Sequence, residues 1–256
     1  MAASHPLLAA LRRALKLAGD PARALGQQAY MKSAMRYHGV RAPDMRKICR
    51  EVFDGYDFAP TSARRAAWRR DVLAIWRGAP FREERYAAIE LTQVRKARAL
   101  HLFDVVPMFE EMIVGGAWWD FVDSLASHNL GFILDEDPKS MRRTMLEWSR
   151  SDDMWKRRSA ILCQLHFGER TDLGLLYRCI EPSLSSEEFF LRKAIGWALR
   201  QYAWTDPAEV TRYVEANDAR LSPLSKREAL KNVAPKSAAG AKESATSSRG
   251  APRRTA

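Results

Sequence analysis

The segment WKRRSAI at residues 155–161 recurs in degenerate form as FFLRKAI at residues 189–195. Each segment contains an Arg-x-Ala-Ile motif with an aromatic residue three positions before the arginine. The two motifs lie 34 residues apart. Ala88-Ile89 lies 72 residues before Ala160-Ile161, about two such periods. Helix pairs recurring roughly every 35–45 residues are typical of HEAT-like solenoids. We therefore predict an all-α, HEAT-like repeat α-solenoid, a curved stack of antiparallel helix pairs with a concave face.

Helical periodicity extends over the chain from about Pro6 to Val233, without alternating strands or hairpin signals. Asp137-Pro138 and Asp206-Pro207 each place a capping residue before a proline, which predicts a helix start. Ser185 with Glu188, and Ser225 with Glu228, have the spacing of a capping box, in which each side chain binds the backbone N–H of the other residue. We expect helices to begin there too.

The two ends of the chain differ in composition. Residues 2–17 place four leucines on one helical face and carry no acidic residue, which fits either a mitochondrial presequence or the first helix of a solenoid. Residues 234–256 lack large apolar side chains and hold five basic residues against one acidic residue. Such a segment cannot bury enough apolar surface to fold. The predicted division is a repeat domain at 1–233 and a disordered basic tail at 234–256.

The charge balance predicts a polyanionic partner. The chain holds 42 Lys and Arg against 31 Asp and Glu, a net charge of +11, which attracts DNA, RNA or an acidic membrane surface. No apolar run reaches the roughly 20 residues that a membrane span needs, so we expect no membrane insertion. The three cysteines, Cys49, Cys163 and Cys179, fall within apolar helical patterns. We expect buried, reduced thiols in a cytoplasmic protein.

No motif for a metal or a nucleotide cofactor is present. The sequence lacks a glycine-rich phosphate loop, His-Glu-x-x-His and Cys-x-x-Cys, and we predict neither a cofactor nor a metal. The histidines show no pairwise ligand spacing and are expected to be surface or core residues: His5, His38, His101, His128 and His166.

The motif WWDFVD at residues 118–123 stands out chemically. On a helix, Trp119 and Asp123 share one face, whereas Trp118 and Val122 share another, which we expect to be buried. A carboxylate beside an indole on an exposed face is poorly explained by packing alone. The alternative is that the motif holds two core tryptophans and two solvated or capping aspartates.

Two further groups have matching positions. Trp155 and Arg158 share a helical face, as do Lys193, Trp197 and Arg200. Asp123, Arg158 and Lys193 lie 35 residues apart in turn, so the repeat would place them at equivalent points on successive helices. Arginines that bind phosphate and indoles that pack on sugar or base would form a DNA surface. The alternative is an ordinary solvated helix face and a core tryptophan.

Several segments closely resemble the DNA alkylation repair glycosylases of the HEAT-like AlkD type. They occur in the family's order and cover roughly residues 8–233: Tyr30–Lys32 with Gly39–Pro43, Trp118–Asp123, Ser151–Leu162, Phe189–Tyr202 and Leu224–Glu228. The chain departs from the family in its basic tail and at Arg41-Ala42, where a short polar pair would be expected to contact DNA.

The resemblance implies roles for individual residues. Asp123 matches the catalytic carboxylate, Trp119 and Trp197 match the aromatic residues flanking the damaged nucleotide, and Arg158 matches the active-site arginine, which we expect to bind the backbone phosphate beside the lesion. Tyr30 matches an aromatic contact to the substrate backbone. The basic residues expected to bind DNA are Lys32, Lys193, Arg200, Lys226 and Arg227.

We therefore expect a monofunctional glycosylase that hydrolyses cationic N3- or N7-alkylated purines from double-stranded DNA, as a nucleoid-associated cytoplasmic monomer. The resemblance also implies that the base stays exposed toward solvent instead of entering a pocket. One alternative is a non-catalytic HEAT-like protein that binds damaged or branched DNA. Another is a scaffold whose concave face binds a protein helix, with negligible affinity for DNA at about 150 mM salt, which is at odds with the basic chain.

Overall fold

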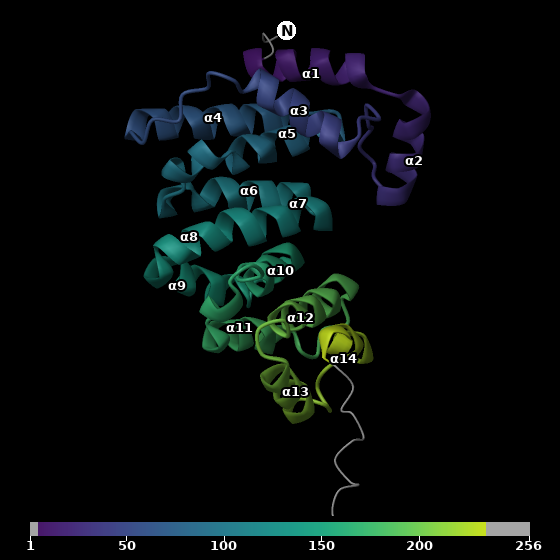
Figure 1. Ribbon diagram of the computed structural model, residues 1–256, viewed down its shortest axis with the longest axis vertical. Coiled ribbons are helices and arrows are strands. Elements are labelled where there is room, and N and C mark those ends of the chain that lie inside the picture. Colours follow the sequence, from purple (N-terminus) through teal and green to yellow (C-terminus); the bar gives the residue numbers. More distant parts are fainter. Residues whose placement is uncertain (1–4, 234–256) are drawn as a thin grey trace, which may run out of the picture.

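The computed structural model describes residues 5–233, in which helices follow one another along the long axis of the molecule (Figure 1). The α-helices are α1 (Pro6–Ala18), α2 (Pro21–Met31), α3 (Ala42–Val52), α4 (Ser62–Gly78), α5 (Arg82–Gln93), α6 (Val106–Gly116), α7 (Trp119–Ser124), α8 (Gly131–Glu136), α9 (Pro138–Trp148), α10 (Met154–Leu162), α11 (Leu173–Ile180), α12 (Phe189–Tyr202), α13 (Pro207–Ala216) and α14 (Pro223–Ala229). Within residues 5–233 the extended structure amounts to one β-bridge, between Arg36 and Phe81. The predicted all-α, HEAT-like solenoid is confirmed.

The structure tests the prediction for the amino-terminal segment but not the one for the carboxy-terminal segment. Helix α1 buries Leu8, Leu11 and Leu15 against α3, α4 and α5, so the amino-terminal segment forms the first helix of the stack. The predicted basic tail, residues 234–256, lies outside the described residues. No helix among residues 5–233 combines the length and apolar character needed to cross a membrane.

The predicted helix starts are confirmed at two positions. The side chains of Asp137 and Asp206 accept hydrogen bonds from backbone N–H groups three residues ahead, at 3.1 and 2.9 Å, and a proline follows each aspartate. These bonds satisfy donors that an uncapped helix would leave open. The Asp-Pro pairs therefore mark the starts of α9 and α13.

Both predicted capping boxes are wrong. Helix α12 begins after Glu188, whose side chain makes no capping bond, because the Oγ of Ser186 accepts from the N–H of Glu188 in the preceding turn. The cap of helix α14 lies three residues before the predicted one, since the side chain of Ser222 accepts from the N–H of Ser225 at 3.0 Å and Pro223 stands in the first turn. At α14 the Ser222-Pro223 pair, and not the capping-box spacing, therefore sets where the helix begins.

The helices form two layers. In one layer α3, α5, α7, α10, α12 and α14 pack each against the next, and we call this set the site layer. On its other side, α1 packs on α4 and α4 on α6, and α9 packs on α11. The predicted site residues at positions 119, 123, 158, 193, 197, 200, 226 and 227 lie on the site layer.

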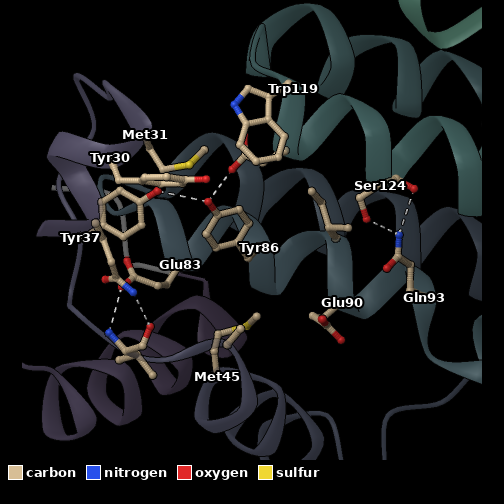
Figure 2. Close-up of a pocket in the computed structure, with 15 residues that line it drawn as sticks. Tyr30, Met31, Tyr37, Met45, Glu83, Tyr86, Glu90, Gln93, Trp119 and Ser124 are labelled. Atoms are coloured by element: carbon tan, nitrogen blue, oxygen red, sulfur yellow. Dashed lines mark hydrogen bonds between the residues drawn. The ribbon is translucent and has the colours of Figure 1, made fainter. Parts of the chain in front are cut away.

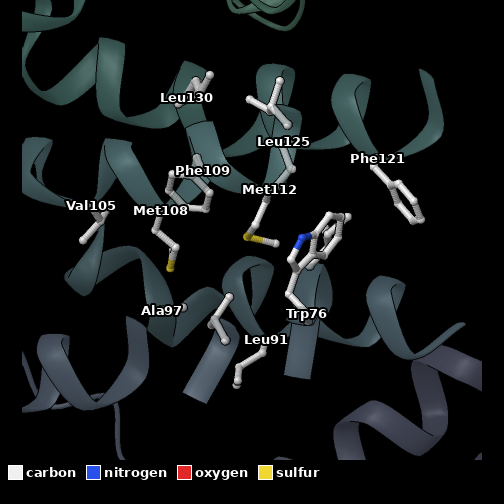
Figure 3. Packing of buried hydrophobic residues seen from close by; sticks show 14 of the residues in the cluster. Trp76, Leu91, Ala97, Val105, Met108, Phe109, Met112, Phe121, Leu125 and Leu130 are labelled. Atoms are coloured by element: carbon white, nitrogen blue, oxygen red, sulfur yellow. The ribbon is translucent and has the colours of Figure 1, made fainter. Parts of the chain in front are cut away.

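The core is apolar and continues along the stack. Figure 3 shows Trp76 of α4, Leu91 of α5 and Met112 of α6 meeting in the space between successive helices, with Leu125 beyond them. A second cluster joins α10 to α14. The three cysteines lie in this core as free thiols, as predicted. Burial raises the pKa of each, to about 12 for Cys179, which keeps these thiols protonated.

The backbone around α7 departs from regular helix on both sides. Ala117, just before α7, has φ of 41°, in the left-handed region that non-glycine residues rarely adopt. After α7 the chain continues through a π-helical turn, Leu125–Leu130, into α8, and the Oγ of Ser127 donates to the carbonyl of Asp123 at 2.7 Å. Such strain and π-turns occur preferentially at functional sites.

Candidate active site

A buried ion pair lies at the centre of the site layer. The guanidinium of Arg158 donates from Nε to Oδ1 of Asp123 at 2.6 Å and from Nη2 to Oδ2 at 2.8 Å. Its Nη1 donates to the carbonyl of Phe190. Only 9% of Asp123 and 4% of Arg158 is exposed. The pair therefore fixes the Asp123 carboxylate at the junction of α7, α10 and α12.

Burial and pairing act on Asp123 in opposite directions. Loss of water around the carboxyl raises its pKa above the ordinary value, whereas the hydrogen bonds and charge of Arg158 lower that pKa, and the nearby charge of Asp120 raises it again. Burial has the largest effect, so the net shift of the pKa is upward. The carboxylate is a poorly hydrated negative charge in a fixed orientation, which is suited to stabilise a developing positive charge.

Arg158 also has partners that the sequence did not predict. Its guanidinium, which we predict to bind a DNA phosphate, binds Asp123 and the carbonyl of Phe190 within the protein. The solvated-aspartate alternative is also excluded, because Asp120 pairs with Arg82 and accepts from the hydroxyl of Tyr86. Each aspartate of the motif therefore has its own arginine.

The tryptophans fall into two groups. Trp118 packs on Trp155 and Phe190 with ring centroids at 6.3 and 5.5 Å, so this indole supports the junction between α7, α10 and α12. Val122 is fully buried as expected, whereas Trp118 is half-buried. Trp119 is half-buried and lines a cavity, and Trp197 is half-buried on α12 against the second apolar cluster.

The predicted DNA-binding cations lie at two places. Lys193 and Arg200 both bind Glu228, at 3.1 and 2.9 Å, and Lys226 pairs with Asp218 at 2.8 Å. Arg227 and Lys32 are exposed, and among residues 5–233 no ion pair involves either. Lys32 ends α2 with φ of 48°, close to Tyr30, which is 78% exposed. The basic residues therefore flank the ion pair at the α2 and α14 ends of the molecule.

A cavity that was not predicted from the sequence lies beside Trp119. It has a volume of about 370 Å³, and its aromatic lining comprises Tyr30, Tyr37, Tyr86 and Trp119 (Figure 2). The hydroxyls of Tyr37 and Tyr86 lie 3.2 Å apart, and burial raises the pKa of both. A signal was present, because Tyr86, Glu90 and Gln93 recur at helical spacing and together line this cavity. Within residues 5–233 no group of His, Cys, Asp or Glu side chains is arranged to hold a metal ion.

The fold and this geometry define an α-solenoid with a buried acid–arginine pair in a basic chain. The family model described as DNA alkylation repair enzyme matches residues 11–233, and the chain belongs to this family. A solved structure described as a predicted DNA alkylation repair enzyme from Enterococcus faecalis is similar to this chain with 28% identity and a TM-score of 0.74. The similarity covers 84% of this chain and 97% of that chain. No curated protein matches the sequence. Membership of this family gives the protein a role in DNA alkylation repair, with DNA as its partner.

Proposed function

We propose that the protein is a monofunctional DNA glycosylase that hydrolyses the N-glycosidic bond of cationic N3- or N7-alkylated purines in duplex DNA. The observation that carries this proposal is the fixed position of the Asp123 carboxylate, because both of its oxygens accept hydrogen bonds from Arg158. A carboxylate fixed in this way needs no rearrangement when positive charge develops beside it, which is the condition for efficient electrostatic catalysis.

The reaction requires little from the protein because the substrate is already activated. The bond between C1′ and the purine nitrogen breaks, and its electron pair neutralises the positive charge of the base, which leaves without a general acid. Positive charge then concentrates on the deoxyribose, as in the oxocarbenium-like transition states of glycoside hydrolysis. Asp123 stabilises this charge and orients the attacking water. The water oxygen bonds to C1′, and its proton passes to the carboxylate.

The remaining candidate residues bind and orient the DNA. The indoles of Trp119 and Trp197 face the cationic nucleotide, and each such cation–π contact contributes about 0.5–2 kcal/mol. Tyr30 and the basic residues Lys32, Lys193, Arg200, Lys226 and Arg227 contact the backbone. Arg158 acts as a positioning residue for Asp123. In this proposal the enzyme is a monomer in the cytoplasm, associated with the nucleoid, and works without a metal or cofactor.

Asp123→Asn tests this function most directly, because it keeps the shape of the side chain and removes its charge. We expect release of 7-methylguanine or 3-methyladenine from methylated duplex to fall at least a hundredfold, or about 2.7 kcal/mol. The measurement is free base separated from DNA by chromatography under single-turnover conditions, with an assay for strand nicking, which we expect to be absent.

Asp104→Asn is the matched control, because Asp104 forms an exposed pair with Arg65 and lies outside the site layer. This control should retain the wild-type rate. Near-full activity in Asp123→Asn would show that another group performs the chemistry. Tight, salt-sensitive binding of alkylated duplex by the wild-type chain without any base release would instead identify a non-catalytic DNA-binding protein.

A further inference from the structure

Helix α7 carries two aspartates, and each is held by a buried arginine from a different neighbouring helix. Asp123 accepts from Nε and Nη2 of Arg158 on α10. Asp120 accepts from the same two nitrogens of Arg82 on α5, with Nε 3.2 Å from Oδ2. The two pairs are equally buried, with side-chain exposures of 5% and 12% in the first and 4% and 12% in the second. The proposed chemistry uses only the first pair.

The start of α7 has little support from its own sequence. The helix has six residues, and helices this short are not stable alone in water. The side chain of Trp118 makes no capping hydrogen bond at its amino-terminal end, and Ala117 before it has φ of 41°. Strained residues persist where the surrounding structure holds them in place. Asp120 is the second residue of α7, so its pair with Arg82 supplies such support at this end.

Tyr86, one turn along α5 from Arg82, completes the contact. Its hydroxyl donates to Oδ2 of Asp120 and accepts from Nε of Arg82 at 3.1 Å. Figure 2 shows this hydroxyl directed toward the start of α7, beside Trp119. Both oxygens of Asp120 therefore have donors from α5. We call Arg82, Tyr86 and Asp120 the α5–α7 clamp.

The same arginine also reaches the end of α2. Nη1 of Arg82 donates to Oγ of Ser33 at 3.1 Å, and the backbone N–H of Met35 donates to that oxygen at the same distance. Ser33 follows Lys32, which ends α2 in the left-handed region. The backbone N–H of Arg82 donates to the carbonyl of Arg36 at 2.9 Å. One buried guanidinium therefore joins the end of α2 to α5 and α7.

We propose that the α5–α7 clamp positions Trp119 beside the damaged nucleotide and holds the end of α2 at a fixed distance from it, an inference that rests on the proposed glycosylase function. Trp119 directly precedes Asp120, so a shift of the aspartate moves the indole. Tyr30 and Lys32, the proposed backbone contacts, lie within three residues of Ser33. The clamp residues are positioning residues, and a misplacement of about 1 Å can lower a rate by about a hundredfold.

The first experiment removes one hydroxyl. Tyr86→Phe keeps the ring and loses the bond to Asp120, so we expect the saturating single-turnover rate of 7-methylguanine release to fall at least about tenfold, as for a hydrogen bond to a charged group. The Kd for unmodified duplex should stay within about twofold, because the basic contacts remain. A merely structural role would lower only the stability and leave the saturating rate of the folded protein unchanged, which would overturn the inference.

Tyr37→Phe is the matched control for this variant. The hydroxyl of Tyr37 lies 3.2 Å from that of Tyr86 and makes no hydrogen bond to Asp120, so its loss removes the same atoms outside the clamp. This control should keep the wild-type rate. An equal loss of rate in Tyr37→Phe and Tyr86→Phe would contradict a specific role for the bond to Asp120.

The second experiment separates orientation from charge. Arg82→Lys keeps the positive charge but loses the planar fork that binds both oxygens of Asp120. We expect the saturating rate to fall at least about tenfold here too. Arg77→Lys is the matched control, because Arg77 also binds both oxygens of a carboxylate, that of Glu111, from α4 outside the site layer. A wild-type rate in Arg82→Lys would show that charge alone suffices, and the positioning role would fail.

A spectroscopic measurement separates this inference from the glycosylase itself. The eight tryptophans each give an indole N–H resonance in a ¹H–¹⁵N spectrum, and Trp119→Phe identifies that of Trp119. This resonance should shift or broaden in Tyr86→Phe and Arg82→Lys and stay unchanged in both controls. If it does so in a chain that releases no base, the glycosylase is refuted and the clamp stands. If base is released but neither substitution moves the resonance, the clamp alone is refuted.

Discussion

Asp123 and Glu90 are carboxylates on neighbouring helices of the site layer, and they differ in what surrounds their charge. Burial raises the pKa of both. Asp123 has a two-pronged partner in Arg158, whereas Glu90 has no partner within residues 5–233. The difference separates two uses of a negative charge. The first is compensated and oriented by the protein before any substrate arrives, and the second is left to solvent, since neither of its oxygens is among the buried atoms without a partner.

The first test of this difference removes the partner of Asp123. Arg158→Ala leaves a buried carboxylate uncompensated, and loss of one member of a buried pair destabilises a protein by roughly 3–5 kcal/mol. We expect a loss of this size in urea denaturation at neutral pH, together with loss of base release. The loss should shrink in acid, because a protonated Asp123 carries no charge to compensate.

The chain offers a matched control for this substitution. Arg170 pairs with Asp135, also 35 residues earlier, but both side chains are largely exposed. Arg170→Ala should change the free energy of unfolding by less than about 1 kcal/mol, as for other surface pairs. A similar cost for Arg158→Ala and Arg170→Ala would mean that Asp123 is solvated in solution. The comparison with Glu90 would then lose its basis.

The next substitution acts on the uncompensated member. In the folded chain the pKa of Glu90 lies above its ordinary value of 4.5, so folding favours the protonated carboxyl. The stability from this proton is complete below the unfolded pKa and is lost as pH rises through the folded pKa. Glu90→Gln removes that loss and should raise the free energy of unfolding at neutral pH by about 0.5–2 kcal/mol, the usual range for stabilising substitutions.

The pH dependence identifies the cause of this gain. Urea denaturation of wild type and Glu90→Gln should give curves that converge in acid and diverge above the unfolded pKa. A gain of equal size at every pH would come from packing and not from charge. A destabilised Glu90→Gln would mean that the carboxylate has a compensating partner in solution, which would remove the contrast with Asp123.

The sequence predicted the helical stack and most of its organisation, because helical periodicity and Asp-Pro caps are local signals. The capping boxes failed where another local signal was stronger, as at Ser222-Pro223. The 35-residue spacing placed Asp123 and Arg158 on helices that prove to be in contact. The register of the repeat therefore predicted part of the site as well as the fold.

The partners within the site were not predictable in the same way. Register places Arg158 next to Asp123, but whether its guanidinium faces inward or toward phosphate depends on side-chain packing across α7, α10 and α12. The cavity is still harder to predict from the sequence, because its lining comes from segments that are distant in the chain. Tyr30 and Tyr37 lie there beside Tyr86 and Trp119. Glu90 is an ordinary helical glutamate in sequence, and only its surroundings in space distinguish it.

The smallest expected effect tests whether any cation near Glu90 acts as its partner. Arg46 is exposed on α3 without an ion pair among the described residues, and its positive charge lowers the pKa of Glu90. Arg46→Met should therefore reduce the free energy of unfolding at neutral pH, by about 0.2–0.5 kcal/mol for such a screened interaction. In the Glu90→Gln background this cost should vanish, which a double-mutant cycle measures.

Lys47→Met on the same helix serves as the control, because Lys47 is exposed and lies 4.0 Å from Glu51. Its effect should be the same with and without the Glu90 charge. A coupling between Arg46 and Glu90 as large as that of a buried pair, several kcal/mol, would show that the arginine folds onto the carboxylate in solution. Glu90 would then resemble Asp123, and the contrast between the two carboxylates would disappear.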